Sequence, residues 1–343
     1  MLYYYALLYY NINLKQINTM KKIHLISTLI GLLAFSTISK ADLKVVTSIK
    51  PIHSLAGYIM DGVGSPGLIV DGYNSPHSFQ LKPSHAKMLE QADIIFWIGE
   101  DLENFLEKPL ATIAMKAQKI ELLEINGIKK LKFRERNIFE EHEGHDDHGD
   151  DAKKEKHDDH GHDAKKEEHD DHEGHGHGEY DPHIWLDPIN AKVILNEITE
   201  HLIENDSKNA STYKSNLAKA LAEIDKLIID VITETNTDLS YVVFHDAYQY
   251  YENRFNVNIL GAMTVNPDVM PGAEQIHEIH EIIEHDNVSC ILSEPQFNPD
   301  IIKSIAKDTN VKTGVLDPLG ANLKPGKNLY FDLIRNMSSS FNC

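Results

Sequence analysis

The sequence of 343 residues has only two cysteines and two tryptophans, and its formal net charge is −20 at pH 7. It shows no basic patch, which excludes nucleic acid as a partner, because nucleic-acid-binding domains carry clustered Lys and Arg. It also lacks the HExxH motif of zinc metalloproteases and the Gly-x-Ser-x-Gly turn of serine hydrolases, which argues against an enzyme. No apolar run beyond the first 41 residues approaches the length of a membrane span, so we expect a soluble mature protein.

The first 41 residues have the layout of a secretory signal peptide. Met20-Lys21-Lys22 precedes a largely apolar stretch, Ile23–Ser36, and Ser39-Lys40-Ala41 supplies small residues for cleavage. Met20 is a candidate for the true start, and an uncleaved N-terminal anchor is the alternative. Removing the signal leaves 302 residues, enough for two domains of ordinary size.

The two cysteines are Cys290 and Cys343. An even number of cysteines in an exported protein favours a disulfide, here between the C-terminus and the strand-like segment Val288–Leu292. Closing a loop of this length stabilises by roughly 4 kcal/mol when chain entropy alone is counted. Two free thiols, with Cys290 simply buried, are the alternative that the residues leave open.

Strand-like and helix-like segments alternate in both halves of the chain. In the first half the expected strands are Leu43–Ile49, Leu68–Val70, Ile94–Gly99 and Ile120–Ile125. In the second half they are Tyr241–Phe244, Val257–Leu260, Val288–Ser293 and Lys312–Leu316. This alternation predicts an α/β fold with two lobes, each built on a mainly parallel sheet flanked by helices.

A long helix is expected between the lobes, from about Ser207 to Thr235. Its apolar residues recur at helical spacing: Tyr213, Leu217, Leu221, Ile224, Ile228 and Val231. About 29 residues at 1.5 Å each make a rod of roughly 43 Å. We therefore place an N-terminal lobe at residues 42–138 plus 180–206, the linking helix at 207–236 and a C-terminal lobe at 237–343.

Residues 139–179 differ in composition from the rest of the chain. Between Glu140 and Glu179 there are 17 acidic residues, 5 lysines and ten of the 20 histidines, and His-Asp-Asp-His recurs every 12 residues. With almost no apolar residue, this segment should be disordered. A charge-rich linker would not need so many histidines, so we predict an auxiliary metal-collecting loop that uses His142, His145, His148, His157, His160, His162, His169, His172, His175 and His177.

Three other histidines each lie at a strand end or a helix start. His77 follows the strand-like Gly67–Val70, His183 lies between two Asp-Pro pairs, and His245 follows Tyr241–Phe244. Three neutral imidazoles with one open position make a zinc site that can exchange its ion. We predict that these three histidines meet around one Zn²⁺ between the lobes.

The fourth ligand of that site is left open among Asp317, water and, less favoured, Glu294. Both carboxylates fall at the carboxyl ends of expected strands, where α/β folds bind ligands. More carboxylate in the site would shift the preference from zinc toward manganese. The remaining histidines considered are expected to be ordinary polar residues on or beside helices, with weak surface chelation by the pair 277 and 280 as an alternative: His85, His201, His277, His280 and His285.

Five segments resemble the ZnuA family, the periplasmic zinc-binding proteins of bacterial high-affinity zinc ABC importers. They are Thr47-Ser48-Ile49-Lys50-Pro51, Phe244-His245-Asp246-Ala247-Tyr248, Thr264-Val265-Asn266-Pro267 with Pro271-Gly272-Ala273, Glu294-Pro295-Gln296-Phe297 and Leu316-Asp317-Pro318-Leu319-Gly320. The likeness covers essentially the whole mature chain. It includes an acidic His-rich loop just before the second zinc histidine.

The resemblance implies two α/β lobes joined by one long helix, with zinc held between them by His77, His183 and His245. Members of the family often have an acidic residue directly before the first histidine, where this chain has Pro76; this leaves water or Asp317 as the fourth ligand. The manganese-binding relatives place an Asp near the position of Asp317. The resemblance also implies a disulfide between the two cysteines.

The function implied by the resemblance is periplasmic zinc capture by a protein expected to be monomeric. The loaded protein would deliver the ion to a membrane permease driven by a cytoplasmic ATPase. Two alternatives are kept. One is a manganese-binding or adhesin-type protein of the same fold. The other is a zinc hydrolase, in which the three histidines would activate a water molecule and Glu294 or Asp317 would act as the base.

Overall fold

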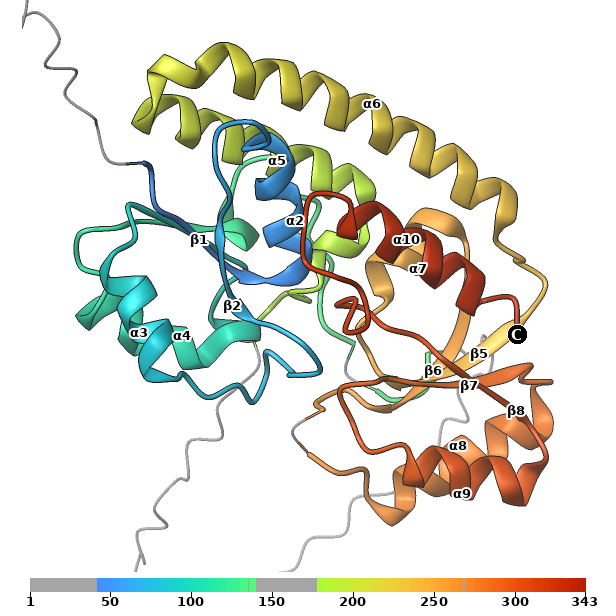
Figure 1. Ribbon diagram of the computed structural model, residues 1–343. Helices are drawn as coiled ribbons and strands as arrows, with labels where there is room; N and C mark the ends of the chain where they lie inside the picture. The colour runs from blue at the N-terminus through green and yellow to red at the C-terminus, as the bar shows by residue number, and fades with distance from the viewer. Residues whose placement is uncertain (1–41, 135, 140–177, 268) are drawn as a thin grey trace, which may run out of the picture. The chain divides into compact units, whose positions relative to one another are not determined.

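The computed structural model describes residues 42–134, 136–139, 178–267 and 269–343 (Figure 1). The expected signal peptide at residues 1–41 lies outside these described residues, as do residues 140–177 with the ten histidines of the expected collecting loop. The compact unit considered below runs from Leu43 to Cys343. In the described part of the chain, no helix has the length and apolar character needed to cross a bilayer.

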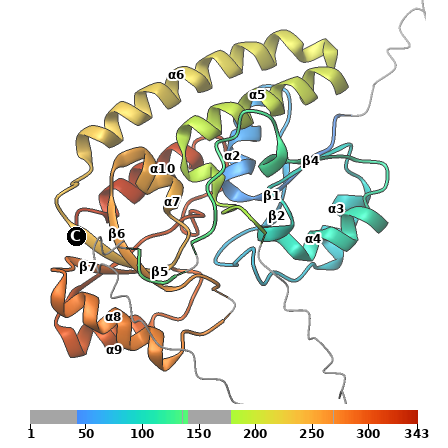
Figure 2. The same cartoon turned by 180° about the vertical axis from the view of Figure 1, so that it is seen from behind.

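The first sheet has four parallel strands in the order β2-β1-β3-β4. They are β1 (Val45–Ile49), β2 (Gly67–Val70), β3 (Ile94–Trp97) and β4 (Gln118–Glu121). Every residue of β1 and β3 is buried, as apolar strands covered on both faces require. The helices connecting these strands are α2 (Lys50–Ile59), α3 (Pro83–Glu90) and α4 (Glu100–Thr112), seen from behind in Figure 2.

The second sheet repeats this plan in the order β6-β5-β7-β8, again with parallel pairs. Its strands are β5 (Ser240–His245), β6 (Asn258–Thr264), β7 (Cys290–Ser293) and β8 (Lys312–Val315). The helices are α7 (Gln249–Phe255), α8 (Ala273–His285) and α9 (Asp300–Thr309), and α8 and α9 lie together on one face (Figure 1). The predicted fold class of two α/β lobes with parallel sheets is confirmed.

Along the chain, two helices connect the first sheet to the second: α5 (Pro188–Asn205) and α6 (Ala210–Glu234). A 3-10 turn at Ser207–Asn209 lies between them. The 25 residues of α6 span about 38 Å, and in Figure 1 the helix extends over both lobes. The exact lobe boundaries given above remain a prediction.

The buried face of α6 differs from the predicted stripe. Its buried residues are Tyr213, Asn216, Ala220, Ile224, Leu227 and Val231. The predicted members Leu217, Leu221 and Ile228 are only partly buried. Asn216 belongs to the buried face because its amide donates hydrogen bonds to the carbonyls of Ile59 and Asp61, both at 2.9 Å. The periodicity of apolar residues cannot predict that a polar residue such as Asn216 is buried.

Several other elements depart from the sequence prediction. The strand expected at Ile120–Ile125 is shorter and earlier, and a 3-10 turn, Leu122–Glu124, follows β4. The strand expected at Val257–Leu260 continues to Thr264. A last helix, α10 (Leu329–Ser340), was not predicted; it packs against α2 and α6. Part of the expected C-terminal lobe therefore contacts a helix of the first lobe.

The segment before the His-rich loop crosses to the second sheet. The backbone N–H of Phe139 donates to Leu260 O, and Ala262 N–H donates to Asn137 O, both at 2.8 Å. Gly261 permits this approach, because a Cβ there would lie 2.6 Å from Asn137 O. Residues 137–139 thus extend the β6 edge, although we expected residues up to 138 to belong to the first lobe.

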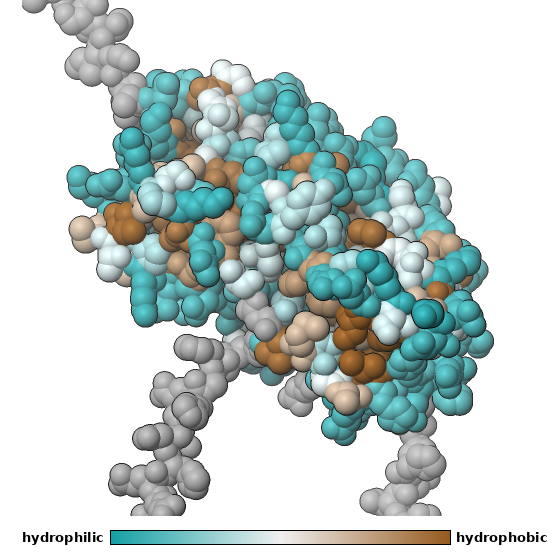
Figure 3. Space-filling view, turned by 60° about the horizontal axis from the view of Figure 1, so that its bottom comes forward, coloured by the Kyte–Doolittle hydropathy of each residue, from teal (hydrophilic) through white to brown (hydrophobic). Residues whose placement is uncertain are grey.

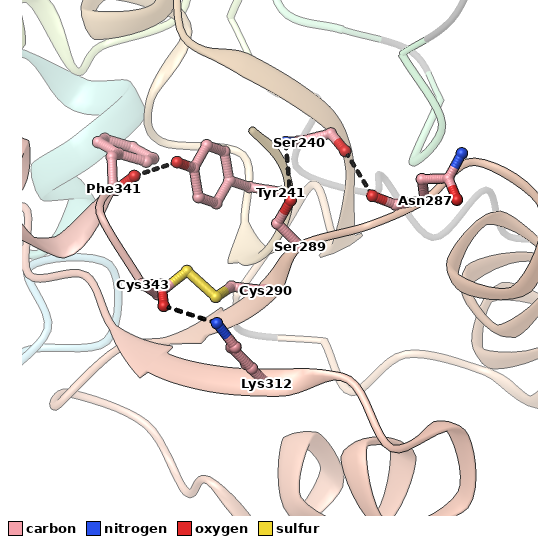
Figure 4. The surroundings of a disulfide bond; sticks show 8 residues. All are labelled: Ser240, Tyr241, Asn287, Ser289, Cys290, Lys312, Phe341 and Cys343. Carbon is pink, nitrogen blue, oxygen red and sulfur yellow. Dashed lines mark hydrogen bonds between the residues drawn. A yellow bond between two sulfur atoms is a disulfide. The ribbon is translucent and has the colours of Figure 1, made fainter. Parts of the chain in front are cut away.

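A disulfide joins Cys290 at the start of β7 to Cys343 at the end of the chain (Figure 4). Lys312 donates a hydrogen bond to the Cys343 carbonyl at 3.2 Å. The ring of Phe341 packs edge-on against Tyr241 of β5, with centroids 5.0 Å apart. The predicted disulfide is confirmed, and it fixes the end of α10 to the second sheet.

The surface turned forward in Figure 3 is mostly hydrophilic, with apolar side chains in separate groups. Large exposed apolar residues of the described chain come from different segments and include Met115, Ile229, Ile232, Met270 and Val315. Single exposed apolar side chains of this kind are normal for folded proteins.

A buried carboxyl group lies at the carboxyl end of the first sheet. Glu103, at an irregular turn within α4, is fully buried. Its Oε2 accepts hydrogen bonds from the backbone N–H of Ile98 at 2.7 Å and of Gly99 at 3.2 Å. Burial raises the pKa of this carboxyl to about 7, against the smaller opposing effect of these bonds. Glu103 therefore keeps its proton over much of the acidic range.

Replacing Glu103 by Gln should flatten the pH dependence of stability. A folded-state pKa of about 7 lies above the ordinary value of 4.5, so the stability from the protonated carboxyl is complete below pH 4.5 and is lost as the pH rises through 7. This loss is at most about 3 kcal/mol. Urea unfolding from pH 4.5 to 7.5 should show a steeper fall for the wild type than for Glu103→Gln. The exposed Glu107 on the same helix supplies the control, Glu107→Gln; parallel curves for all three proteins would contradict this assignment.

Candidate metal centre

Three histidines from distant parts of the sequence converge in space. One ring nitrogen from each of His77, His183 and His245 lies within 4.8 Å of the other two. The ring centroids are separated by 5.6, 5.6 and 5.3 Å. Over the residues that the structure describes, no other group of three or more His, Cys, Asp or Glu side chains is arranged in this way. The predicted convergence of these three side chains is present.

Each histidine is placed by a different kind of element. His77 lies in the loop that follows β2, and its backbone N–H donates to Ser75 Oγ at 3.3 Å. His183 precedes a 3-10 turn, Ile184–Leu186, whose three side chains are fully buried. His245 is the last residue of β5, at the carboxyl edge of the second sheet. The site therefore uses the edge at which parallel α/β sheets bind ligands.

Two buried carboxylates set the orientation of two of these rings. Asp181 Oδ1 lies 2.7 Å from His183 Nδ1 and also accepts the His183 backbone N–H at 2.9 Å. Glu294 Oε1 lies 2.6 Å from His245 Nδ1. Burial raises the pKa of Asp181 to about 7, but its Oδ1 already accepts the His183 backbone N–H and therefore acts as an acceptor toward Nδ1 as well. With both carboxyl oxygens accepting, each Nδ1 carries the hydrogen and each Nε2 presents its lone pair. This is the arrangement that metal-binding histidines use.

The Nε2 atoms of His183 and His245, which carry the free lone pairs, lie close together. His183 Nε2 and His245 Nε2 are 3.4 Å apart. With both Nδ1 atoms protonated, neither Nε2 of the neutral rings has a hydrogen to donate to the other. A tetrahedral zinc ion at about 2.0–2.1 Å from each nitrogen separates the two nitrogens by about 3.3–3.4 Å. The spacing therefore fits tetrahedral zinc without movement of either ring.

The protonation of the two buried rings is set by different neighbours. Burial lowers the pKa of His183 well below 6.5, and the adjacent His245 lowers it further. Burial also lowers the pKa of His245, but Glu294 and other nearby carboxylates raise it by more, so the net change is upward. The imidazole of His183 is therefore neutral at neutral pH, whereas His245 takes up a proton more readily as the pH falls.

A small cavity of about 10 Å³ lies at the three histidines, which is about the volume that one water molecule needs. Its other lining residues are Ser75, Pro76, Trp185, Glu294, Gln296, Phe297, Pro318 and Leu319. Most of these walls are apolar, so an ion here would be shielded from bulk solvent. Ser75, Gln296 and Phe297 also line a larger groove of about 610 Å³.

Neither carboxylate considered as a fourth ligand belongs to the converging group. Asp317 Oδ1 accepts hydrogen bonds from Gln296 Nε2 at 2.9 Å and from the backbone N–H groups of Leu319 and Gly320 at 3.1 and 3.0 Å. Its Oδ2 accepts the N–H of Ala321. Glu294 binds the far side of the His245 ring. Both side chains support the site from outside, and water is the remaining one of the three candidates for the fourth ligand.

Sequence reasoning missed three supporting residues. Asp181 was noted only as part of an Asp-Pro pair. Its position two residues before His183 could have indicated that its carboxylate binds the histidine ring. Lys50 is buried and donates to the carbonyls of Gly320, Ala321 and Leu323 at 2.9–3.0 Å. It thereby ties the loop that follows Asp317 to the start of α2.

Arg134 is the third missed residue, and it neutralises part of the acidic interior beside the site. It donates to Asp246 Oδ1 at 3.0 Å and to Glu252 Oε2 at 2.7 Å. Burial raises the pKa of Asp246 to about 6 despite this contact. Arg134 is one of several basic residues that precede the acidic segment, so the sequence gives no signal for such a role.

The histidines expected to be ordinary polar residues lie outside the converging group. His85 Nδ1 accepts the backbone N–H of Lys82 at 3.2 Å. His201 lies 2.9 Å from Gln118 Nε2 and 3.0 Å from Glu197. His277 pairs with Glu281 on the surface of α8 at 3.5 Å. The two others, His280 and His285, are on the same helix.

Comparison with known proteins identifies the family to which this chain belongs. A family model described as ZnuA, the periplasmic component A of a zinc-uptake complex, matches residues 45–342. The high-affinity zinc uptake system protein ZnuA of Brucella abortus (strain 2308) is 46% identical over 304 residues, covering 86% of this chain and 90% of that protein. The protein of the same name from Yersinia pestis is 36% identical over 315 residues, covering 91% and 94%.

Solved structures show the same fold at lower sequence identity. A crystal structure of ZnuA matches with a TM-score of 0.66 at 20% identity, covering 88% of this chain and 100% of that chain. A mutant of the laminin-binding adhesin from Streptococcus agalactiae matches with a TM-score of 0.67 at 21% identity, covering 88% and 98%. The family match spans nearly all of the unit that contains the three histidines. This chain therefore belongs to the ZnuA family of periplasmic zinc-uptake components.

Proposed function

We propose that this protein captures Zn²⁺ in the periplasm as the solute-binding component of a zinc ABC importer. It then delivers the ion to a membrane permease that a cytoplasmic ATPase drives. The observation that carries the proposal is the pair of carboxylate-oriented imidazoles whose Nε2 atoms lie 3.4 Å apart, with His77 beside them. Relatives named as high-affinity zinc uptake proteins, at up to 46% identity, support the assignment of the cargo.

Zinc is favoured over manganese by the donor set. The three converging side chains offer nitrogen, and the two nearest carboxylates, Asp181 and Glu294, are bound to the far sides of the rings. Nitrogen-rich tetrahedral sites suit Zn²⁺, whereas Mn²⁺ prefers oxygen donors. We therefore propose His77, His183 and His245 as the zinc ligands, with one water molecule as the fourth. A competition titration of zinc against manganese tests this preference.

The same carboxylate contacts argue against hydrolysis at this site. A hydrolase needs a general base that can reach the metal-bound water. Glu294 is bound to His245, and both oxygens of Asp317 accept hydrogen bonds from its own loop and Gln296. These contacts suit a site that holds and releases an ion.

The His-rich segment at residues 139–179 is proposed to collect zinc for the tight site. Its ten histidines are typical of a segment that binds several metal ions weakly. It precedes His183 directly in the sequence, and Gly178 at its end donates to Asp101 Oδ1 at 2.9 Å. We also propose that residues 1–41 act as the export signal and that the mature protein works as a monomer.

Removing any of the three proposed ligands should abolish tight zinc binding. His77→Ala, His183→Ala and His245→Ala should each weaken the zinc Kd by more than about 100-fold, beyond the range typical of outer-shell changes. His277→Ala is the matched control, since His277 has a carboxylate partner but lies on the exposed surface of α8. Chelator-competition titrations measure these constants, in wild type and in a variant lacking residues 140–177. Tight 1:1 binding that survives both His245→Ala and the deletion would refute the assignment.

Zinc binding should weaken as the pH falls from about 7.5 to about 5.5. Imidazole must be neutral to bind a metal, and its ordinary pKa is about 6.5. The raised pKa of His245 means that a proton already competes with zinc for this ring above that value. The apparent Kd should therefore rise about tenfold for each pH unit over which one proton is displaced. Calorimetry at both pH values checks this, and a constant Kd would exclude imidazole ligation.

The two orienting carboxylates should matter for affinity without touching the ion. Asp181→Asn and Glu294→Gln remove the charge behind His183 and His245, and each should weaken zinc binding about 10- to 100-fold. Glu281→Gln is the control, because it removes a carboxylate beside a histidine outside the site. Equal zinc Kd values for the control and both site variants would show that these carboxylates do not contribute to zinc affinity.

A further inference from the structure

The turn after β7 brings three side chains, from Glu294, Gln296 and Phe297, to the cavity at the three histidines. Phe297 N–H donates to Glu294 O at 3.2 Å and closes the turn. Glu294 orients His245, and the Phe297 ring stacks on Phe244 with centroids 4.8 Å apart and meets His245 edge-on. Gln296 lies between these two fixed residues and lines the same cavity. Its side chain is therefore carried on a rigid support.

The orientation of the Gln296 amide follows from its partner. Gln296 Nε2 donates to Asp317 Oδ1 at 2.9 Å. The Asp317 carboxylate also accepts three backbone N–H groups, so it is a charged acceptor held in place. Only the amide nitrogen can face this carboxylate, because the amide oxygen would repel it. The oxygen Oε1 is thereby turned away from Asp317.

Gln296 Oε1 is buried and has no hydrogen-bond partner among the described residues. Buried polar atoms in native proteins almost always have one, and an exception calls for a specific reason. The surrounding cavity contains the three histidines and apolar walls. None of the histidine nitrogens presented to the cavity by His183 and His245 carries a hydrogen. A water molecule held on the cargo ion would supply a donor for Oε1.

We propose that Gln296 Oε1 accepts a hydrogen bond from the water molecule that completes the zinc shell. This inference rests on the proposed zinc-binding function. Water on Zn²⁺ is a strong donor because the ion polarises its O–H bonds. A neutral amide holds this water without adding a negative charge to the site. Gln296 is thus a positioning residue for the fourth ligand, and the open coordination position stays exchangeable.

Two substitutions at Gln296 separate this role from support of the Asp317 loop. Gln296→Met keeps the length of the side chain but removes both the acceptor and the donor. Gln296→Glu keeps an oxygen that can accept from the water, but it replaces the donating amide beside Asp317 with a second carboxyl group. The matched control is Gln80→Met, because Gln80 is exposed and lines the outer groove but not the histidine cavity. Thermal unfolding of each variant establishes that it folds.

The measurements are zinc Kd by chelator competition and the visible spectrum of the protein loaded with Co²⁺, which reports coordination. Gln296→Met should weaken zinc binding about tenfold, an effect of outer-shell size, and change the Co²⁺ spectrum. Gln296→Glu keeps the accepting oxygen and should weaken binding less than Gln296→Met does, while the control Gln80→Met should stay within about threefold of wild type, below the outer-shell range. The proposal is overturned if Gln296→Met binds like wild type. It is also overturned if both Gln296 variants lose affinity equally, or if a zinc-bound structure shows Oε1 as a direct ligand.

Failure of the zinc-binding function itself would give a different pattern. Wild type would then lack tight 1:1 binding, or His245→Ala would bind as well as wild type. In the results that overturn only the role of Gln296, wild type binds tightly and His245→Ala does not.

Discussion

The site depends on two short contacts between a buried carboxylate and an imidazole. Asp181 and Glu294 hold the Nδ1 hydrogens of His183 and His245, and this leaves two Nε2 lone pairs 3.4 Å apart. Without these contacts, either ring could present the wrong nitrogen or turn away. The carboxylates are kept off the ion while their charge favours a cation nearby. The proposed donor set is therefore rich in nitrogen, which is the kind of site that suits zinc.

The surrounding hydrogen bonds hold segments from both lobes at this point. The loop that follows β8 is central: Trp185 Nε1 donates to Pro318 O at 2.8 Å, and Tyr248 donates to Leu316 O at 3.2 Å. Lys50 binds three carbonyls of the same loop from the first lobe. These contacts link His183, the end of β5 and the start of α2 into one rigid frame. Helix α6 and the disulfide-anchored helix α10 stabilise this frame from outside.

The fold could be predicted where local sequence carries the signal. The buried strand β3 is a continuous apolar run, and the alternation of strands with helices is regular, so the α/β class was evident. Helix α10 was missed because its segment follows a Pro- and Gly-containing loop and its burial comes from α2 and α6. Residues 137–139 were assigned to the first lobe, since nothing local shows that their backbone pairs with β6. Asn216 was left out of the buried stripe for the same reason.

The sequence by itself determined the alternation of strands and helices and the placement of His77, His183 and His245 at element ends. It also determined the resemblance that made zinc the expected cargo. The tertiary structure decided how the His245 ring is oriented, because Glu294 contacts it from 49 residues further along the chain, whereas Asp181 orients His183 from two residues away. Asp317 could not be distinguished from a ligand in the sequence, since its hydrogen bonds to its own loop exist only in the folded chain. Residue type and local pattern are encoded along the chain, whereas the direction of a side chain is set by neighbours distant in sequence.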